Sequence, residues 1–170
     1  MKYGDAMRRA LALLALCACH PLSLYAPPEL PASLPAGTGS KVEILLDDRG
    51  IPHIYGSSLP DVSFGLGFMH GRDRLFQVML LRHAAQGRLG ELFGEELLDT
   101  DRRLRLVSWK LDEHVAALGE ADRRLLDAYV AGLNAGAQHA GKSPEMALLR
   151  VDVPRFEPRD ALSIMRLQAW

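Results

Sequence analysis

The sequence predicts an α+β fold that is mostly helical and carries a β-hairpin near its amino terminus. Val42, Ile44 and Leu46 recur at every second position, which is typical of a strand. A turn-forming Asp-Asp-Arg-Gly and a second short apolar stretch, 51–55, complete the hairpin pattern. From about residue 61 onward apolar residues recur at spacings of three and four, which is the period of an amphipathic helix.

Two residues define the geometry of the hairpin. Gly50 closes the turn at 47–50, because glycine adopts the positive φ that the turn needs. Pro52 lacks a backbone N–H, so the second strand must lie at a sheet edge or begin there. His53 could act as a ligand or a base, but no second candidate lies close in sequence. We therefore expect a packed, hydrogen-bonded histidine.

A long helix should follow the hairpin. We expect it to run to about Ala85, with Ser58 or Asp61 as its cap and Gly87 at its end. Three glycines interrupt its first half: Gly65, Gly67 and Gly71. Each costs about 1 kcal/mol relative to alanine in a helix, so we expect another backbone to pack close by.

Three further helices are predicted. They run from Asp99 to about Leu118, from Ala121 to Ala140 and from Ala161 to Trp170, the last capped by Asp160. The glycine-bounded stretch 87–94 reads as a short helical turn between the first two long helices.

Residues 1–19 read as a targeting segment. Two arginines precede an apolar core of about nine residues, which is long enough for a signal sequence and too short to cross a bilayer. Leu16-Cys17-Ala18-Cys19 is similar to a bacterial lipobox and makes Cys19 the lipidation candidate. Soluble export after cleavage and a retained segment remain alternatives, and Met1 or Met7 could be the start. The expected location is the periplasm or the membrane surface of a bacterium, as an exported protein or anchored lipoprotein.

Residues 20–40 predict an extended spacer between this segment and a domain that begins near Lys41. Prolines recur through the stretch together with glycines and serines, and such a composition does not form a packed core.

The charge pattern excludes one class of partner and points to internal ion pairs. The net charge is −1 and both signs are mixed, so no face is basic enough for nucleic acid. Arg72, Asp73 and Arg74 interrupt an apolar segment, where at least one charge must turn inward and pair. If Asp73 forms a dry pair, its replacement should cost about 3–5 kcal/mol. Arg88 and Glu91 offer an i,i+3 pair.

The sequence supplies no set of catalytic, cofactor-binding or metal-binding residues. It contains neither the Gly-x-Ser-x-Gly elbow nor a phosphate-binding loop, and both cysteines, Cys17 and Cys19, lie in the leader. His70 and His83 are thirteen positions apart, too far along one helix to share a metal.

Several motifs, in this order, resemble the opening of the penicillin acylase family. They are Asp-Arg-Gly-Ile-Pro-His-Ile at 48–54, Gly-Leu-Gly-Phe at 65–68, Arg-Asp-Arg-Leu-Phe-Gln at 72–77, Gly-Arg-Leu-Gly-Glu-Leu-Phe-Gly at 87–94, Tyr129 with Gly132 and Asn134, and Arg-Phe-Glu-Pro at 155–158 with Asp160. The resemblance covers roughly 42–170 and is specific through its order and density. It corresponds to the amino-terminal part of that family's α segment.

This resemblance implies a larger enzyme. Members are amino-terminal nucleophile hydrolases with a four-layer αββα fold, made as precursors and cut into α and β segments. The β segment begins with the serine nucleophile, whose own α-amino group acts as base at a pKa of roughly 7.7–8.0. Residues 41–170 would then be an incomplete α segment that needs the β segment as partner. No catalytic residue falls on this chain.

The resemblance also implies ligands of the complete enzyme. The expected substrates are small N-acyl compounds, such as β-lactams with side-chain amides or acyl-homoserine lactones. No cofactor is expected within this chain, and calcium is possible in the complete protein. The alternatives to an amide-hydrolase fragment are a non-catalytic helical lipoprotein and a truncated gene product.

Overall fold

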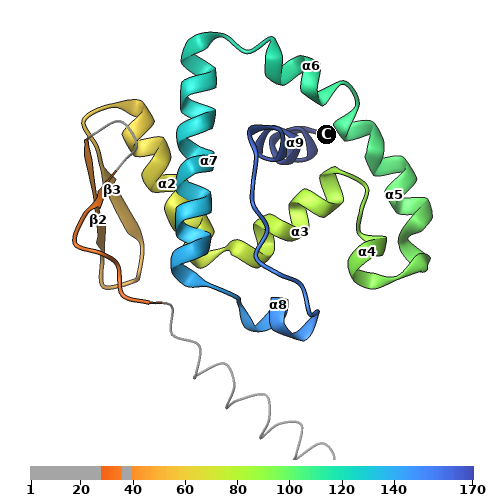
Figure 1. Cartoon of the computed structure of the whole chain (residues 1–170), viewed down its shortest axis with the longest axis horizontal. Helices are drawn as coiled ribbons and strands as arrows, with labels where there is room; N and C mark the ends of the chain where they lie inside the picture. The colour runs from red at the N-terminus through yellow and green to blue at the C-terminus, as the bar shows by residue number, and fades with distance from the viewer. Residues whose placement is uncertain (1–27, 36–39) are drawn as a thin grey trace, which may run out of the picture.

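A small sheet and a helical body make up the computed structural model, which describes residues 28–35 and 40–170 (Figure 1). The strands are β1 (Leu34–Pro35), β2 (Lys41–Leu46) and β3 (Pro52–Tyr55). The helices are α2 (Leu59–Asp73), α3 (Leu75–Ala85), α4 (Gly90–Phe93), α5 (Leu98–Leu104), α6 (Leu111–Ala116), α7 (Glu120–Ala140), α8 (Pro144–Leu148) and α9 (Pro158–Ala169), with 3₁₀ turns at Glu95–Leu97 and Arg105–Ser108.

The predicted hairpin is confirmed. β2 and β3 pair antiparallel with Ile44 opposite Ile54, and Gly50 has the expected positive φ of 75°. The Asp47 carboxylate accepts hydrogen bonds from the backbone N–H groups of Arg49 and Ile51, which fixes the turn. His53 differs from the expectation: it is exposed and lies 3.7 Å from Asp47, because its strand is at the sheet edge and its side chain points to solvent.

Residues 28–35 belong to the folded body, so the spacer interpretation needs correction for this part. β1 pairs antiparallel with β2, with Leu34 opposite Val42. Leu34 is buried and Leu30 packs against the same apolar cluster, which offsets the proline-rich composition of the stretch. Segment 1–19 with Cys19 lies outside the described residues.

The close approach that the glycines of α2 predict is made by α7. A Cβ atom on Gly67 would lie 2.0 Å from the carbonyl oxygen of Tyr129, and one on Gly71 would lie 2.1 Å from that of Leu133. Gly132 and Gly136 of α7 face α2 in the same way. Because each contact advances by four residues on both helices, α2 and α7 run parallel, as Figure 1 shows.

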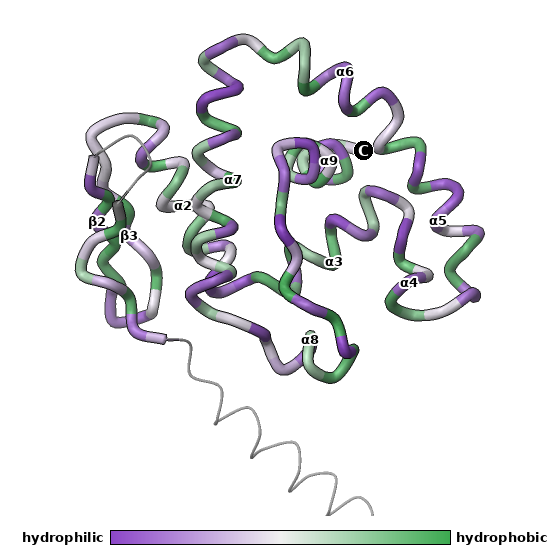
Figure 2. Tube along the Cα trace, viewed as in Figure 1, coloured by the Kyte–Doolittle hydropathy of each residue, from purple (hydrophilic) through white to green (hydrophobic). Residues whose placement is uncertain are grey.

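Two apolar clusters flank this helix pair. One lies between the sheet and α2, around Val42, Phe64 and Phe68. The other joins α3, α7, α8 and α9 around Met79, Leu133 and Phe156. In Figure 2 hydrophilic and hydrophobic positions alternate along α7, as expected of a helix with one buried face.

Two predicted long helices are interrupted. The helix expected to reach Ala85 breaks at Arg74, whose φ of −131° is not helical, and α3 continues in another direction. The break lets Phe68 enter the first cluster and Met79 the second. The helix expected from Asp99 to Leu118 is also divided, because Lys110 adopts a left-handed conformation before α6.

The helix predicted from Ala121 to Ala140 is confirmed as α7. The helix predicted from Ala161 to Trp170 is α9, which begins earlier than expected, at Pro158. Glu157 is the N-cap of α9, and Pro158 occupies its first turn. Asp160 is therefore not the cap but the third helical residue, which accepts from the Glu157 backbone N–H in a capping box. No helix within 28–35 and 40–170 is long and apolar enough to cross a membrane.

Candidate functional site

An open groove of about 670 Å³ is formed between α2, α3, α7 and α9. Leucine, valine, isoleucine and methionine side chains make most of its wall. Its polar lining residues include Ser63, His70, Arg74, Asp122 and Tyr129. A groove of this size with a few polar groups is typical of a surface that receives a ligand or another element of structure.

His70 and Tyr129 form the polar contact on the groove wall. The Nδ1 atom of His70 lies 2.8 Å from the Tyr129 hydroxyl oxygen, and the two rings meet edge to face. Burial lowers the pKa of His70, and the nearby Arg74 guanidinium lowers it further. Burial raises the pKa of Tyr129. Both side chains are therefore uncharged at neutral pH.

The depressed pKa of His70 predicts acid-sensitive stability. The unfolded chain binds a proton on His70 below about pH 6.5, whereas the folded chain resists it, so the free energy of unfolding falls as the pH drops below that value. His70→Gln should flatten this decline while leaving stability above that pH little changed. Urea unfolding at a series of pH values measures the effect. Equal slopes for both proteins would contradict it.

The serine on the groove wall is not paired with a base. The Ser63 hydroxyl, on the same groove, donates to the backbone carbonyl oxygen of Leu125 at 2.9 Å. Across 28–35 and 40–170 no group of three His, Cys, Asp or Glu side chains could hold a metal ion.

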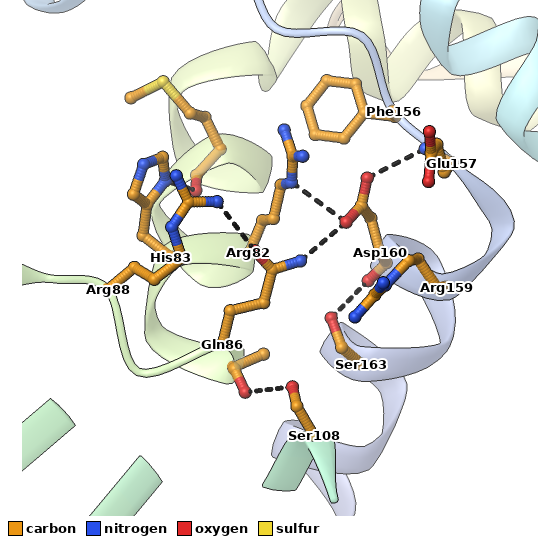
Figure 3. Close-up of polar contacts among 12 residues, drawn as sticks. Arg82, His83, Gln86, Arg88, Ser108, Phe156, Glu157, Arg159, Asp160 and Ser163 are labelled. Carbon is orange, nitrogen blue, oxygen red and sulfur yellow. Dashed lines mark hydrogen bonds and ion pairs between the residues drawn. The ribbon is translucent and has the colours of Figure 1, made fainter. Parts of the chain in front are cut away.

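A buried carboxylate joins α3 to α9 (Figure 3). The Asp160 side chain is 2% exposed and lies 3.0 Å from Nε of Arg82. Its Oδ1 accepts from the Gln86 amide at 2.6 Å and its Oδ2 from the Glu157 backbone N–H at 2.9 Å. The Arg82 guanidinium also stacks 5.5 Å from the Phe156 ring centre. These contacts hold the two groove-forming helices at a fixed spacing.

Asp73 and the two arginines beside it differ in how far their side chains are buried. Arg72 is 8% exposed and pairs with Asp73 at 2.6 Å, while Asp73 is 32% exposed. Arg72 also donates two hydrogen bonds to the carbonyl oxygen of Pro28. Arg74 is exposed and lines the groove. The pair is therefore partly wet, and Arg72 keeps partners when Asp73 is removed.

This geometry revises the expected cost of losing Asp73. Asp73→Ala should destabilise the chain by less than about 1 kcal/mol, as for other solvent-accessible pairs. Arg72→Ala should cost about 1.5–3 kcal/mol, because it also removes the two bonds to Pro28. Thermal and urea unfolding of both variants measures the difference. Equal losses would contradict the assignment.

Arg88 and Glu91 form a two-bond pair at the surface. The guanidinium donates to both carboxylate oxygens at 2.7 Å. The hydrogen bond lowers the pKa of Glu91 and raises that of Arg88. Arg88 also donates to the Gln86 side-chain oxygen at 3.1 Å, which connects the surface pair to the buried Asp160.

Sequence reasoning missed the roles of three buried carboxylates. Asp61 accepts from the hydroxyls of Ser58 and Ser40. Asp101 accepts from the backbone N–H groups of Leu89 and Gly90, at 2.8 Å each. Asp160 could have been found by one signal, the Glu-x-x-Asp capping pattern at 157–160, but its arginine partner lies 78 positions away in sequence.

The fold is shared with a solved acylase structure. It matches a solved thermostable penicillin G acylase from Alcaligenes faecalis with a TM-score of 0.65 and 22% identity, covering 74% of this chain and 70% of that chain. The predicted α+β class is confirmed: the helices and the antiparallel hairpin are arranged as in the matching part of this acylase.

The sequence comparison gives the family. The penicillin amidase family profile matches residues 41–170, and the chain belongs to this family. It is 32% identical over 143 residues to penicillin G acylase of Escherichia coli, covering 78% of this chain. It is 37% identical over 133 residues to the penicillin acylase 2 proenzyme of a Pseudomonas species and 33% identical over 135 residues to an acyl-homoserine lactone acylase of Pseudomonas fluorescens.

The chain spans only a small part of these relatives. It covers 17% of the Escherichia coli and Pseudomonas penicillin acylases and 16% of the acyl-homoserine lactone acylase, against 76–78% of its own length.

Proposed function

We propose that this chain is the amino-terminal α-segment portion of an exported acylase that hydrolyses N-acyl amide bonds. The match of residues 41–170 to the penicillin amidase family is the observation that carries the proposal. The relatives are named for penicillin and for acyl-homoserine lactones, so the substrate class is a small N-acyl compound.

In this proposal residues 41–170 supply scaffold, and the bond-breaking residues lie elsewhere in the protein. The partner is a β segment whose first residue supplies both the nucleophile and the amine base, and the chain has no turnover without it. Calcium would be held by that segment. One of the relatives is itself named a proenzyme.

Export is proposed from the leader. Two arginines followed by an apolar core within residues 1–19 support a signal sequence, and the lipobox-like Leu16–Cys19 supports lipid attachment at Cys19. A periplasmic or membrane-anchored location in a bacterium follows. Metabolic labelling with a radioactive fatty acid tests the attachment. Cys19→Ser should abolish the labelling, and Cys17→Ser should leave it unchanged.

A chimaeric precursor tests the proposed activity. Residues 41–170 replace the matching part of Escherichia coli penicillin G acylase, and the product is assayed on penicillin G and on an N-acyl-homoserine lactone. We expect hydrolysis of at least one of the two amides. A chimaera that folds, is cut into two segments and hydrolyses neither would contradict the proposal.

A further inference from the structure

The groove between α2, α3, α7 and α9 exposes large apolar side chains to solvent. Leu66 is 44% exposed and Met165 is 60% exposed, and both line it. Contiguous exposed apolar surface is uncommon on a finished monomer and marks a place where another element binds.

We propose that the groove receives one amphipathic helix from the part of the acylase outside these 170 residues. This inference rests on the proposed function, since it names the surface by which the α segment binds the rest of its precursor. The chain spans 17% of its penicillin acylase relatives, so most of such a protein is available to cover the groove. The walls are themselves helices, and a further helix packs between helical ridges.

The length of the groove sets the size of the helix. On α7 the lining runs from Asp122 to Leu133. At 1.5 Å per residue this span is roughly 16 Å, or about three helical turns. The apolar face of the occupant must therefore repeat over about eleven residues at spacings of three and four.

Charged side chains on the groove wall determine which charged residues the bound helix should carry. Arg74 and Asp122 both line it, and neither has an ion-pair partner within 28–35 and 40–170. They lie near opposite ends, because α2 and α7 run parallel and Arg74 follows the end of α2 while Asp122 is in the first turn of α7. A complementary helix carries an acidic residue toward Arg74 and a basic residue toward Asp122.

The His70 side chain offers a hydrogen-bonding group on the groove wall between Arg74 and Asp122. Its Nδ1 atom contacts Tyr129, and no partner for Nε2 is found in the described part of the chain. A hydrogen-bonding side chain at the middle of the covering helix would satisfy this ring nitrogen, which is uncharged at neutral pH because burial depresses the pKa of His70.

The test compares Leu66→Glu with Leu148→Glu in two settings. Leu148 is on α8, is 83% exposed and lies outside the groove. In the isolated chain Leu66 is 44% exposed and Leu148 is 83% exposed, so each variant should lower the urea midpoint only slightly. In the chimaera with the Escherichia coli acylase Leu66→Glu buries an unpaired carboxylate and should lower the yield of folded protein by about tenfold, while Leu148→Glu should not. Arg74→Glu should lower the yield several-fold.

Three outcomes would overturn the inference. The first is an equal yield of the Leu66→Glu and Leu148→Glu chimaeras. The second is a loss of stability in the isolated Leu66→Glu chain as large as that expected for a fully buried leucine, which would mean that this chain itself fills the groove. The third is a wild-type chain that dimerises in sedimentation and is made monomeric by Leu66→Glu, which would make a second copy the occupant.

The readout is independent of catalysis. A wild-type chimaera that folds but hydrolyses nothing counts against the proposed function, while its leucine variants still report on the groove. If the chimaera does not accumulate, co-expression of the tagged chain with the rest of the Escherichia coli acylase as a separate polypeptide gives the same comparison. Failure of the wild-type chain to capture that polypeptide would overturn the inference.

Discussion

Replacing Gly132 by alanine should destabilise the chain by about 3 kcal/mol, the upper part of the range for overpacked sites. A Cβ atom at this position would lie 1.9 Å from the carbonyl oxygen of Phe64. The opposing atom belongs to a helical backbone and cannot rotate away, so α2 and α7 must separate. Separation would weaken both apolar clusters, because α2 contributes to one and α7 to the other. Urea unfolding followed by circular dichroism measures the loss.

Gly119→Ala is the matched control for this substitution. Gly119 precedes the same helix with a φ of −60°, and the nearest atom to an added Cβ is 3.9 Å away. Alanine fits there without strain, so stability should stay within about 1 kcal/mol of wild type. A Gly132→Ala chain as stable as the control would mean that the two helices are not in backbone contact.

The second large effect is expected from Asp160→Ala, which should cost about 3–5 kcal/mol. The substitution leaves Arg82, whose side chain is 19% exposed, without its carboxylate. It also removes the acceptors of the Gln86 amide and the Glu157 backbone N–H. The loss should appear as a lower urea midpoint, with α9 freed from α3.

A surface carboxylate that also pairs with α9 provides the control. Asp112 lies 3.3 Å from Arg159, and its side chain is 72% exposed. Asp112→Ala should change stability by less than about 1 kcal/mol, because water screens the pair and solvates the remaining arginine. If both alanine variants lost the same small amount, the Asp160 cluster would be no more than a surface contact.

Local patterns predicted most of the helices and strands. Apolar residues at every second position located the hairpin, and apolar residues at spacings of three and four located α7 and α9. In each element the apolar pattern repeats over enough residues to define one buried face. The glycines of α2 predicted a close backbone neighbour before its identity could be known.

The breaks at Arg74 and Lys110 were not predictable in the same way. Both residues have side chains that a helix tolerates. At Arg74 the chain turns so that α2 reaches one apolar cluster and α3 the other. At Lys110 the left-handed backbone conformation ends the preceding 3₁₀ turn, and no local pattern signals it. The spacer prediction failed at Leu34 for a related reason. The proline-rich composition of residues 28–35 indicates that this stretch does not fold by itself. In the structure it is ordered by pairing with β2.

The groove and the Asp160 cluster required the tertiary structure. Arg82 and Asp160 are far apart in sequence, and four helices contribute to the groove wall. No local pattern joins such positions. The family could be predicted from the sequence, because several short motifs occur in the same order as in the family and together span most of the matched residues.

The most direct test of the central claim is amide hydrolysis by the purified chain alone, beside the chimaera that carries the same residues 41–170. If this chain provides scaffold and the nucleophile lies in another segment, penicillin G and N-acyl-homoserine lactone should both stay intact with the chain alone, and the chimaera should cleave at least one of them. Release of free amine by the purified chain, at a rate proportional to its concentration, would contradict the account.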